Sequence, residues 1–190
     1  MTNKKIAIFA SGNGTNTENI CHYFKGSTRL DVVLVCTNNP DAFVLKRIKK
    51  YNVPSFVFSK LDMNNSDLLE KRLASDGVDF IVLAGFLLKI PKKIINVFND
   101  KIINVHPSIL PKYGGKGMYG DIVHRSVLEN NEKESGITIH FVNENYDDGD
   151  IIFQKTCPVS SGETIDSLSK KIHKLEMGFF PEIIEKTILS

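Results

Sequence analysis

Short apolar runs alternate with amphipathic segments through the first half of the chain. The runs predict strands at residues 5–10, 31–36, 53–58, 80–84 and 102–105. Strands that alternate with helices in this way build a parallel sheet that is covered on both faces. We therefore expect an α/β fold, a doubly wound and mostly parallel sheet flanked by helices.

The segments between these runs have helical spacing of their apolar positions. They predict a helix at residues 17–25 and a second at residues 41–48, which is capped by Asp41. A third helix is expected to begin at Ser66 or Asp67 and to end at Asp76-Gly77. A fourth is expected to begin at Pro91.

After Pro111 the pattern changes. Residues 121–129 predict a helix, and the alternation over residues 137–142 predicts a strand with unlike faces. A further strand at residues 151–157 follows the polar connection 143–150, so the two strands are expected to pair antiparallel. A final amphipathic helix is marked by Ile165, Leu168, Ile172 and Leu175.

The fifth strand carries two polar side chains at its carboxyl end, Asn104 and His106. Residues two apart on a strand point to the same face, and ligands of α/β proteins bind outside the carboxyl ends of parallel strands. Asparagine both donates and accepts hydrogen bonds, and histidine exchanges a proton near neutral pH. The pair indicates polar group-transfer chemistry. The alternative is a purely structural amide and a satisfied histidine at a strand end.

A glycine-containing loop at residues 11–16 joins the first strand to its helix. Free backbone N–H groups at a helix N-terminus favour an anion, so the loop predicts a phosphate site with side-chain help from Thr15 and Asn16. A dinucleotide loop would require glycine where Thr17 stands, and the lysine of a nucleotide-binding P-loop is missing. A tight turn in which Gly12 and Gly14 only relieve backbone strain is the other interpretation.

The acidic stretch at residues 143–150 lacks the spacing of a calcium loop. A carboxylate from this stretch could instead meet His106, where it would orient the imidazole and favour its charged form. Such a pair suits a site in which an oxyanion develops.

Composition narrows the classes of function. A chain of 190 residues fits one soluble domain or two tightly fused halves. Its formal charge of +2 argues against nucleic-acid or membrane partners. Three widely spaced cysteines argue against a disulfide framework and a zinc site. With no signal sequence and no membrane-length apolar run, we expect a cytoplasmic protein. The sequence gives no sign that a metal is needed, so none is expected.

Four segments together resemble a known family. Ser11-Gly12-Asn13-Gly14-Thr15-Asn16, Val82-Leu83-Ala84-Gly85-Phe86, Asn104-Val105-His106-Pro107-Ser108 and residues 136–149 occur in the order seen in the glycinamide ribonucleotide formyltransferases, folate-dependent enzymes of purine synthesis. The resemblance covers essentially the whole chain. It implies a single Rossmann-like formyltransferase domain over residues 1–190, with a phosphate-binding half (1–100) and a catalytic and folate-binding half (101–190).

The resemblance also implies roles for individual residues. Asn104, His106 and Asp147 would be catalytic; Asp147 is preferred to Asp148 because it stands two residues before Gly149. The remaining implied contacts are Gly14, Thr15 and Asn16 to the substrate phosphate, Glu176 and His173 to the substrate, and Phe86, Leu87, Leu88, Lys89, Ile90, Val142 and Asn143 to the folate.

The implied reaction moves a formyl group from 10-formyltetrahydrofolate to the amine of glycinamide ribonucleotide by direct attack, in a monomer or weak homodimer. Formyltetrahydrofolate hydrolysis, transfer to another amine, and a non-catalytic phosphate or folate sensor remain alternatives.

The sequence departs from the family pattern at two places. Lys89 lies in a segment where the family often has arginine. Residues 114–120 form a loop longer than the common form, which is either a mobile cover or a static surface feature.

Overall fold

The structure, a computed structural model, describes residues 3–190 and contains a seven-stranded sheet. Its order is β3-β2-β1-β4-β5-β6-β7; the first five strands pair in parallel, and β5-β6-β7 pair antiparallel. The predicted fold class is confirmed. The strands are β1 (Lys4–Phe9), β2 (Leu30–Thr37), β3 (Ser55–Val57), β4 (Phe80–Leu83), β5 (Ile102–His106), β6 (Glu134–Phe141) and β7 (Ile151–Pro158).

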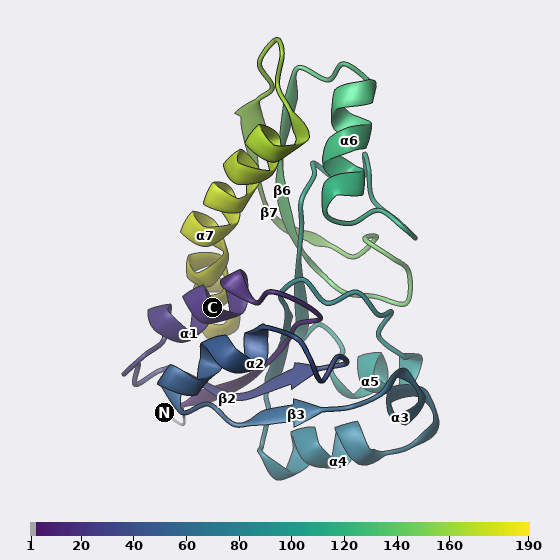
Figure 1. The fold of residues 1–190 in the computed structure, drawn as a ribbon. Coiled ribbons are helices and arrows are strands. Elements are labelled where there is room, and N and C mark those ends of the chain that lie inside the picture. The colour runs from purple at the N-terminus through teal and green to yellow at the C-terminus, as the bar shows by residue number, and fades with distance from the viewer. Residues whose placement is uncertain (1–2) are drawn as a thin grey trace.

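Helices cover both faces of this sheet (Figure 1). Figure 1 shows α3, α4 and α5 on one side, with α1 and the long α7 on the other. Their bounds are α1 (Thr15–Tyr23), α2 (Val44–Arg47), the 3₁₀ turn η1 (Ile48–Tyr51), α3 (Lys60–Asn65), α4 (Leu68–Ser75), α5 (Lys92–Val97), α6 (Asp121–Glu129) and α7 (Ile165–Leu189).

Strand β1 shows why the parallel strands are apolar where helices cover both faces of the sheet. Ile6 and Ile8 pack into the core beneath α1 and α7, whereas Ala7 and Phe9 pack into the core beneath α4 and α5. All four side chains are fully buried. Because successive strand residues face opposite sides, a strand covered on both sides has no position for a polar side chain.

The carboxyl ends of the strands position the polar residues. In the antiparallel register of β5 and β6, Asn104 lies opposite His140 and His106 lies opposite Thr138. The predicted antiparallel pair of C-terminal strands is confirmed, and β6 occupies the position between β5 and β7. This arrangement brings His140 next to the amide of Asn104.

Two local predictions near the first crossovers are wrong. Asp41 does not cap a helix: α2 follows Phe43, makes one short turn and continues as η1. The Asp41 backbone N–H instead donates to the side-chain oxygen of Asn39. This bond closes a turn over residues 39–41, which contains Pro40. The strand expected at residues 53–58 is reduced to β3, a three-residue edge strand.

Helix α3 was not predicted. Its start carries a capping box in which the Ser59 hydroxyl accepts the Asp62 backbone N–H, and the Asp62 carboxylate accepts the Ser59 backbone N–H. The apolar pattern there is too short to reveal a helix, because Met63 is its one buried side chain.

None of the helices within residues 3–190 has the length and apolarity that crossing a membrane requires.

Candidate active site

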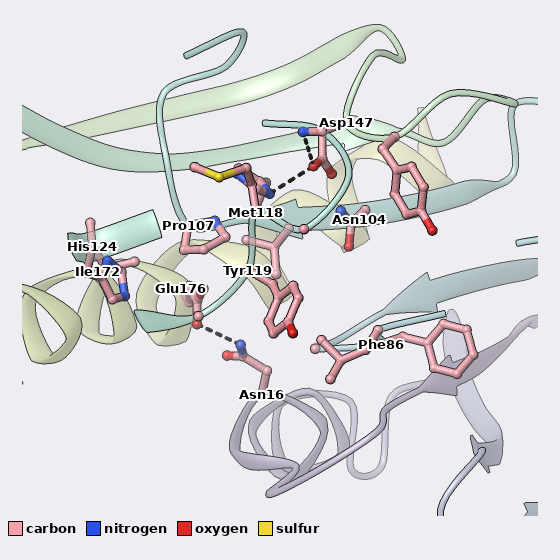
Figure 2. Close-up of a pocket in the computed structure, with 18 of the residues that line it drawn as sticks. Asn16, Phe86, Asn104, Pro107, Met118, Tyr119, His124, Asp147, Ile172 and Glu176 are labelled. Atoms are coloured by element: carbon pink, nitrogen blue, oxygen red, sulfur yellow. Dashed lines mark hydrogen bonds and ion pairs between the residues drawn. The ribbon is translucent and has the colours of Figure 1, made fainter. Parts of the chain in front are cut away.

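A cavity of about 590 Å³ opens at the carboxyl edge of β4 and β5, next to the N-terminus of α1 and the middle of α7. Its volume falls in the range of small-molecule sites. The side chains that line it converge from segments far apart in the sequence (Figure 2). They include Asn16, Phe86, Leu87, Asn104, His106, residues 115–120, His124, Tyr146, Asp147, Ile172, His173 and Glu176.

Asn104 is held by His140. The amide nitrogen of Asn104 lies 3.1 Å from His140 Nε2, and His140 Nδ1 lies 2.7 Å from the carbonyl oxygen of Phe141. A carbonyl only accepts, so Nδ1 carries the hydrogen and Nε2 accepts from Asn104. Burial is the main cause that lowers the pKa of His140, which agrees with this neutral ring. His140 thereby fixes which way the Asn104 amide points.

His106 is buried between two acceptor oxygens. Its Nε2 donates to the carbonyl oxygen of Tyr113 at 2.8 Å, and its Nδ1 lies 3.4 Å from a carboxylate oxygen of Asp147. An imidazolium carries a hydrogen on each nitrogen and would satisfy both acceptors at once. The Nδ1 contact is long for a charge-assisted hydrogen bond, so this side of the ring is the one open to exchange.

Asp147 joins three parts of the site. Besides contacting His106, its carboxylate accepts the backbone N–H of Gly115 at 2.9 Å (Figure 2). The same carboxylate lies 3.8 Å from His140 Nε2. Asp147 itself has a φ of 52°, a left-handed conformation that is strained for most non-glycine residues. The structure thus brings Asn104, His106 and Asp147 together, and it ties the glycine-rich segment 114–120 to them.

The residues of the glycine loop, Gly14, Thr15 and Asn16, differ in whether they line the cavity. Gly14 has a φ of 76°, and a Cβ placed there would lie 2.4 Å from Val44 Cγ2. Conformation and close packing therefore both require glycine at position 14. Gly14 directly precedes α1, Thr15 is the first residue of that helix, and neither lines the cavity, whereas Asn16 does.

The side chain of Asn16 is occupied by Glu176. The amide nitrogen donates to the Glu176 carboxylate at 2.8 Å, and the amide oxygen is buried with no partner among residues 3–190. Glu176 uses one hydrogen of this amide nitrogen, so the second hydrogen and the backbone N–H groups at the start of α1 remain as donors for a phosphate. His173 Nδ1 lies 3.5 Å from the same carboxylate, which raises the pKa of His173.

The seven residues expected to contact folate share a second, smaller pocket of about 70 Å³ beside the cavity. Phe86, Leu87, Leu88, Lys89, Ile90, Val142 and Asn143 all line it. Asn104, Tyr146 and Asp147 border both pockets, so the two adjoin at the polar cluster. Lys89 turns its ammonium over the Tyr146 ring, 5.5 Å from the ring centroid.

Two further histidines belong to the site. The sequence places His140 on a strand near the proposed site, where hydrogen-bonding support is the expected role, and the antiparallel register of β5 and β6 identifies its partner as Asn104. His124, for which its place on a predicted helix indicates a structural or solvent role, lies on α6 and lines the cavity. Within residues 3–190, no three histidine, cysteine, aspartate or glutamate side chains cluster as metal ligands would.

Comparisons with known proteins identify the family of this chain. The family model described as formyl transferase matches residues 4–184. The chain is 40% identical to a chloroplastic phosphoribosylglycinamide formyltransferase of Arabidopsis thaliana over 95% of its own length, but spans 64% of that relative. It is 35% identical to the phosphoribosylglycinamide formyltransferase of Bacillus subtilis over 97% of its own length and 95% of the relative.

A solved structure extends the agreement to the fold. Glycinamide ribonucleotide transformylase 1 from Symbiobacterium toebii superposes with a TM-score of 0.87 at 31% identity, covering 96% of this chain and 86% of that one. The family match and the near full-length Bacillus relative decide the classification. The chain belongs to the formyl transferase family, and within it to the phosphoribosylglycinamide formyltransferases.

Proposed function

We propose that this protein transfers a formyl group from 10-formyltetrahydrofolate to the amine of glycinamide ribonucleotide, a step of purine (IMP) synthesis. The observation that carries the proposal is the cluster of Asn104, His106 and Asp147 at one wall of a ligand-sized cavity. Family membership supports a formyl donor derived from folate. The names of the relatives support the ribonucleotide as the acceptor.

In the proposed reaction the neutral amine of the ribonucleotide attacks the formyl carbon and forms a tetrahedral intermediate with a negatively charged oxygen. Asn104 would donate to that oxygen with the amide hydrogen that His140 does not use. The intermediate then expels the folate nitrogen, which takes up a proton as the carbon–nitrogen bond breaks, while the attacking amine loses one. The products are the formylated ribonucleotide and tetrahydrofolate.

His106 would supply positive charge next to the same oxygen. Its two nitrogens face the carbonyl of Tyr113 and the carboxylate of Asp147, an arrangement suited to an imidazolium. Exchange of the long Asp147 contact for the substrate would let Nδ1 donate to the developing oxyanion. Catalytic hydrogen bonds often tighten in this way when substrate binds.

A covalent enzyme intermediate is not part of this proposal. The Ser108 hydroxyl donates to the carbonyl oxygen of Lys112 and is buried, so it has no general base. Burial raises the pKa of the Cys21 thiol to about 12, and burial also raises the pKa of Cys157. None of these side chains lines the cavity.

Both halves of the chain would contribute to the ribonucleotide site. In residues 1–100, the N-terminus of α1 at Gly14, Thr15 and Asn16 would hold the phosphate mainly through backbone N–H groups. In residues 101–190, Glu176 and His173 would contact the rest of the ribonucleotide. Asn104 and His106 would face the reacting carbon.

The folate would lie across the smaller pocket lined by Phe86, Lys89 and Val142. At about 70 Å³ that pocket is well below the volume of a typical ligand site, so the pterin would require its walls to move apart. The segment Asn143 to Tyr146 supplies one wall and is mostly exposed, which makes it the side able to yield.

The protein is proposed to act as a monomer or weak homodimer, because one chain supplies all of the polar groups described above. A cytoplasmic location is proposed from the cysteines, since Cys21, Cys36 and Cys157 are all free thiols, as expected of a reducing compartment.

A spectrophotometric assay with 10-formyltetrahydrofolate, run with and without glycinamide ribonucleotide, tests the proposal. We expect folate turnover that depends strictly on the ribonucleotide. Turnover of equal rate without it would favour the hydrolase, and turnover with a different amine alone would change the acceptor. Binding of either ligand without any turnover would favour the sensor.

A further inference from the structure

His124 is the one histidine of the cavity to which the proposed reaction gives no task. It lies on the buried face of α6 with 4% of its surface exposed, and it lines the cavity together with Ile172 and Glu176 (Figure 2). Its neighbours on that face of the helix, Val123 and Val127, are ordinary core residues. A polar ring at this position therefore needs a reason beyond packing.

The ring lacks the hydrogen bond that a buried histidine normally has. Within residues 3–190, His124 Nδ1 is buried and has no hydrogen-bond partner. Leaving such an atom unpaired is costly, and most buried polar atoms in native proteins are paired. Because no protein group holds Nδ1, the hydrogen can occupy either nitrogen, and a ligand would decide which.

The electrostatic surroundings limit what that ligand group can be. Burial is the main cause that lowers the pKa of His124, against the opposing effects of the Asp121 and Glu176 carboxylates, so the ring is neutral at pH 7. A neutral ring beside a carboxylate is a poor site for a phosphate. It is a good site for a hydroxyl group, which both donates and accepts.

The neighbouring acceptors point to the same chemistry. Glu176 accepts from Asn16, which leaves carboxylate lone pairs free, and in the part of the chain that the structure describes no group donates to the amide oxygen of Asn16. Of the parts of the proposed acceptor, only the sugar combines hydroxyl donors with a position between the phosphate and the reacting amine.

We propose that His124 is a specificity-determining residue that binds a sugar hydroxyl of the ribonucleotide, together with Glu176. The inference rests on the proposed function, because it names the part of that substrate which this end of the cavity selects. His124 acts in binding and not in the chemical step, so its loss should raise KM and leave kcat nearly unchanged.

The test combines variants with substrate analogues. His124→Phe keeps a flat ring but removes both nitrogens, and His22→Phe, on the exposed side of α1, is the matched control. Steady-state constants are measured with glycinamide ribonucleotide and with its 2′-deoxy and 3′-deoxy analogues. With the parent substrate, His124→Phe should raise KM by roughly 2- to 12-fold, the range of one neutral hydrogen bond.

The analogues separate a direct contact from a structural effect. With the analogue that lacks the bound hydroxyl, His124→Phe and the unaltered protein should have the same KM. An equal penalty for the parent and both analogues, or no penalty for the parent, would overturn the inference. His124→Gln, which is smaller and keeps a donor and an acceptor, should retain most of the affinity for the parent substrate. If the phenylalanine variant does not fold, His124→Leu, which also removes both nitrogens, takes its place in the same comparison.

Turnover by the unaltered protein distinguishes failure of the proposed function from failure of the proposed role of His124. If the unaltered protein shows no turnover that depends on the ribonucleotide, the proposed function and this inference fall together. If it does, and His124→Phe behaves like His22→Phe, only the role of His124 is wrong.

Discussion

The amide of Asn16 donates a hydrogen bond of 2.8 Å to the carboxylate of Glu176, 160 positions later in the chain. The bond joins the first turn of α1 to the middle of α7. It connects the proposed phosphate site to the proposed sugar site, so the spacing between two parts of one substrate depends on it.

A double-mutant cycle on Asn16→Ala and Glu176→Ala should give a coupling of about 1.5–3 kcal/mol in unfolding free energy, because the acceptor is charged and partly buried. Urea titrations of the four proteins measure it. The pair Asp166 and Lys170 on the exposed face of the same helix is the control and should show almost no coupling. Equal coupling in both pairs would mean that burial adds nothing to the Asn16 contact.

Asn104→Ala should lower turnover by roughly 100- to 1000-fold, the usual cost of losing one oxyanion donor. Asn96→Ala, on the exposed side of α5, is the control and should have full activity. Steady-state kinetics with both substrates measure the effect, and thermal melting checks that the variants fold. Unchanged turnover in folded Asn104→Ala would remove Asn104 from the mechanism.

Gly14→Ala should destabilise the protein by about 2–5 kcal/mol, from left-handed strain together with overpacking against Val44. Gly12→Ala in the same loop is the matched control: no atom lies within 4 Å of its would-be Cβ, and its φ is not positive. Its unfolding free energy should change by less than about 1 kcal/mol. Urea unfolding that ranks the two variants equally would contradict the packing argument.

His140 makes stability depend on pH. Its pKa in the folded protein lies below the ordinary value of 6.5, mainly because of burial, so below pH 6.5 the unfolded chain binds more protons than the folded one. The unfolding free energy should therefore be highest above pH 6.5 and fall as the pH drops below it.

Urea titrations at pH 7.5 and 5.5 measure this dependence. The loss of unfolding free energy between the two pH values should be smaller in His140→Gln than in the unaltered protein. Some loss should persist because burial also lowers the pKa of His124. A loss of the same size in both proteins would show that His140 is not the group responsible.

The sequence predicts the sheet well because its strands are covered on both faces, and a strand such as Phe80–Leu83 then has no polar position to obscure the pattern. It fails at Asp41, where a good capping residue is used in a turn instead. Local side-chain bonds of this kind compete with a helix start, and periodicity cannot decide between them.

The candidate site shows the same limit. Asn104 and His106 are predicted to share a site because strand geometry alone places them on one face. The support from His140 depends on the β5–β6 register, and the Asn16–Glu176 bond depends on how α7 packs. Contacts between distant segments are decided by tertiary packing, which leaves no periodic signal in the sequence.

The most direct test of the account follows the formyl carbon itself. The protein is incubated with ¹³C-formyl-labelled 10-formyltetrahydrofolate and glycinamide ribonucleotide, and the products are analysed by NMR. The account predicts that the label lost from folate appears in equal amount on the amine of the ribonucleotide. Label that appears as free formate, with the ribonucleotide unchanged, would contradict it.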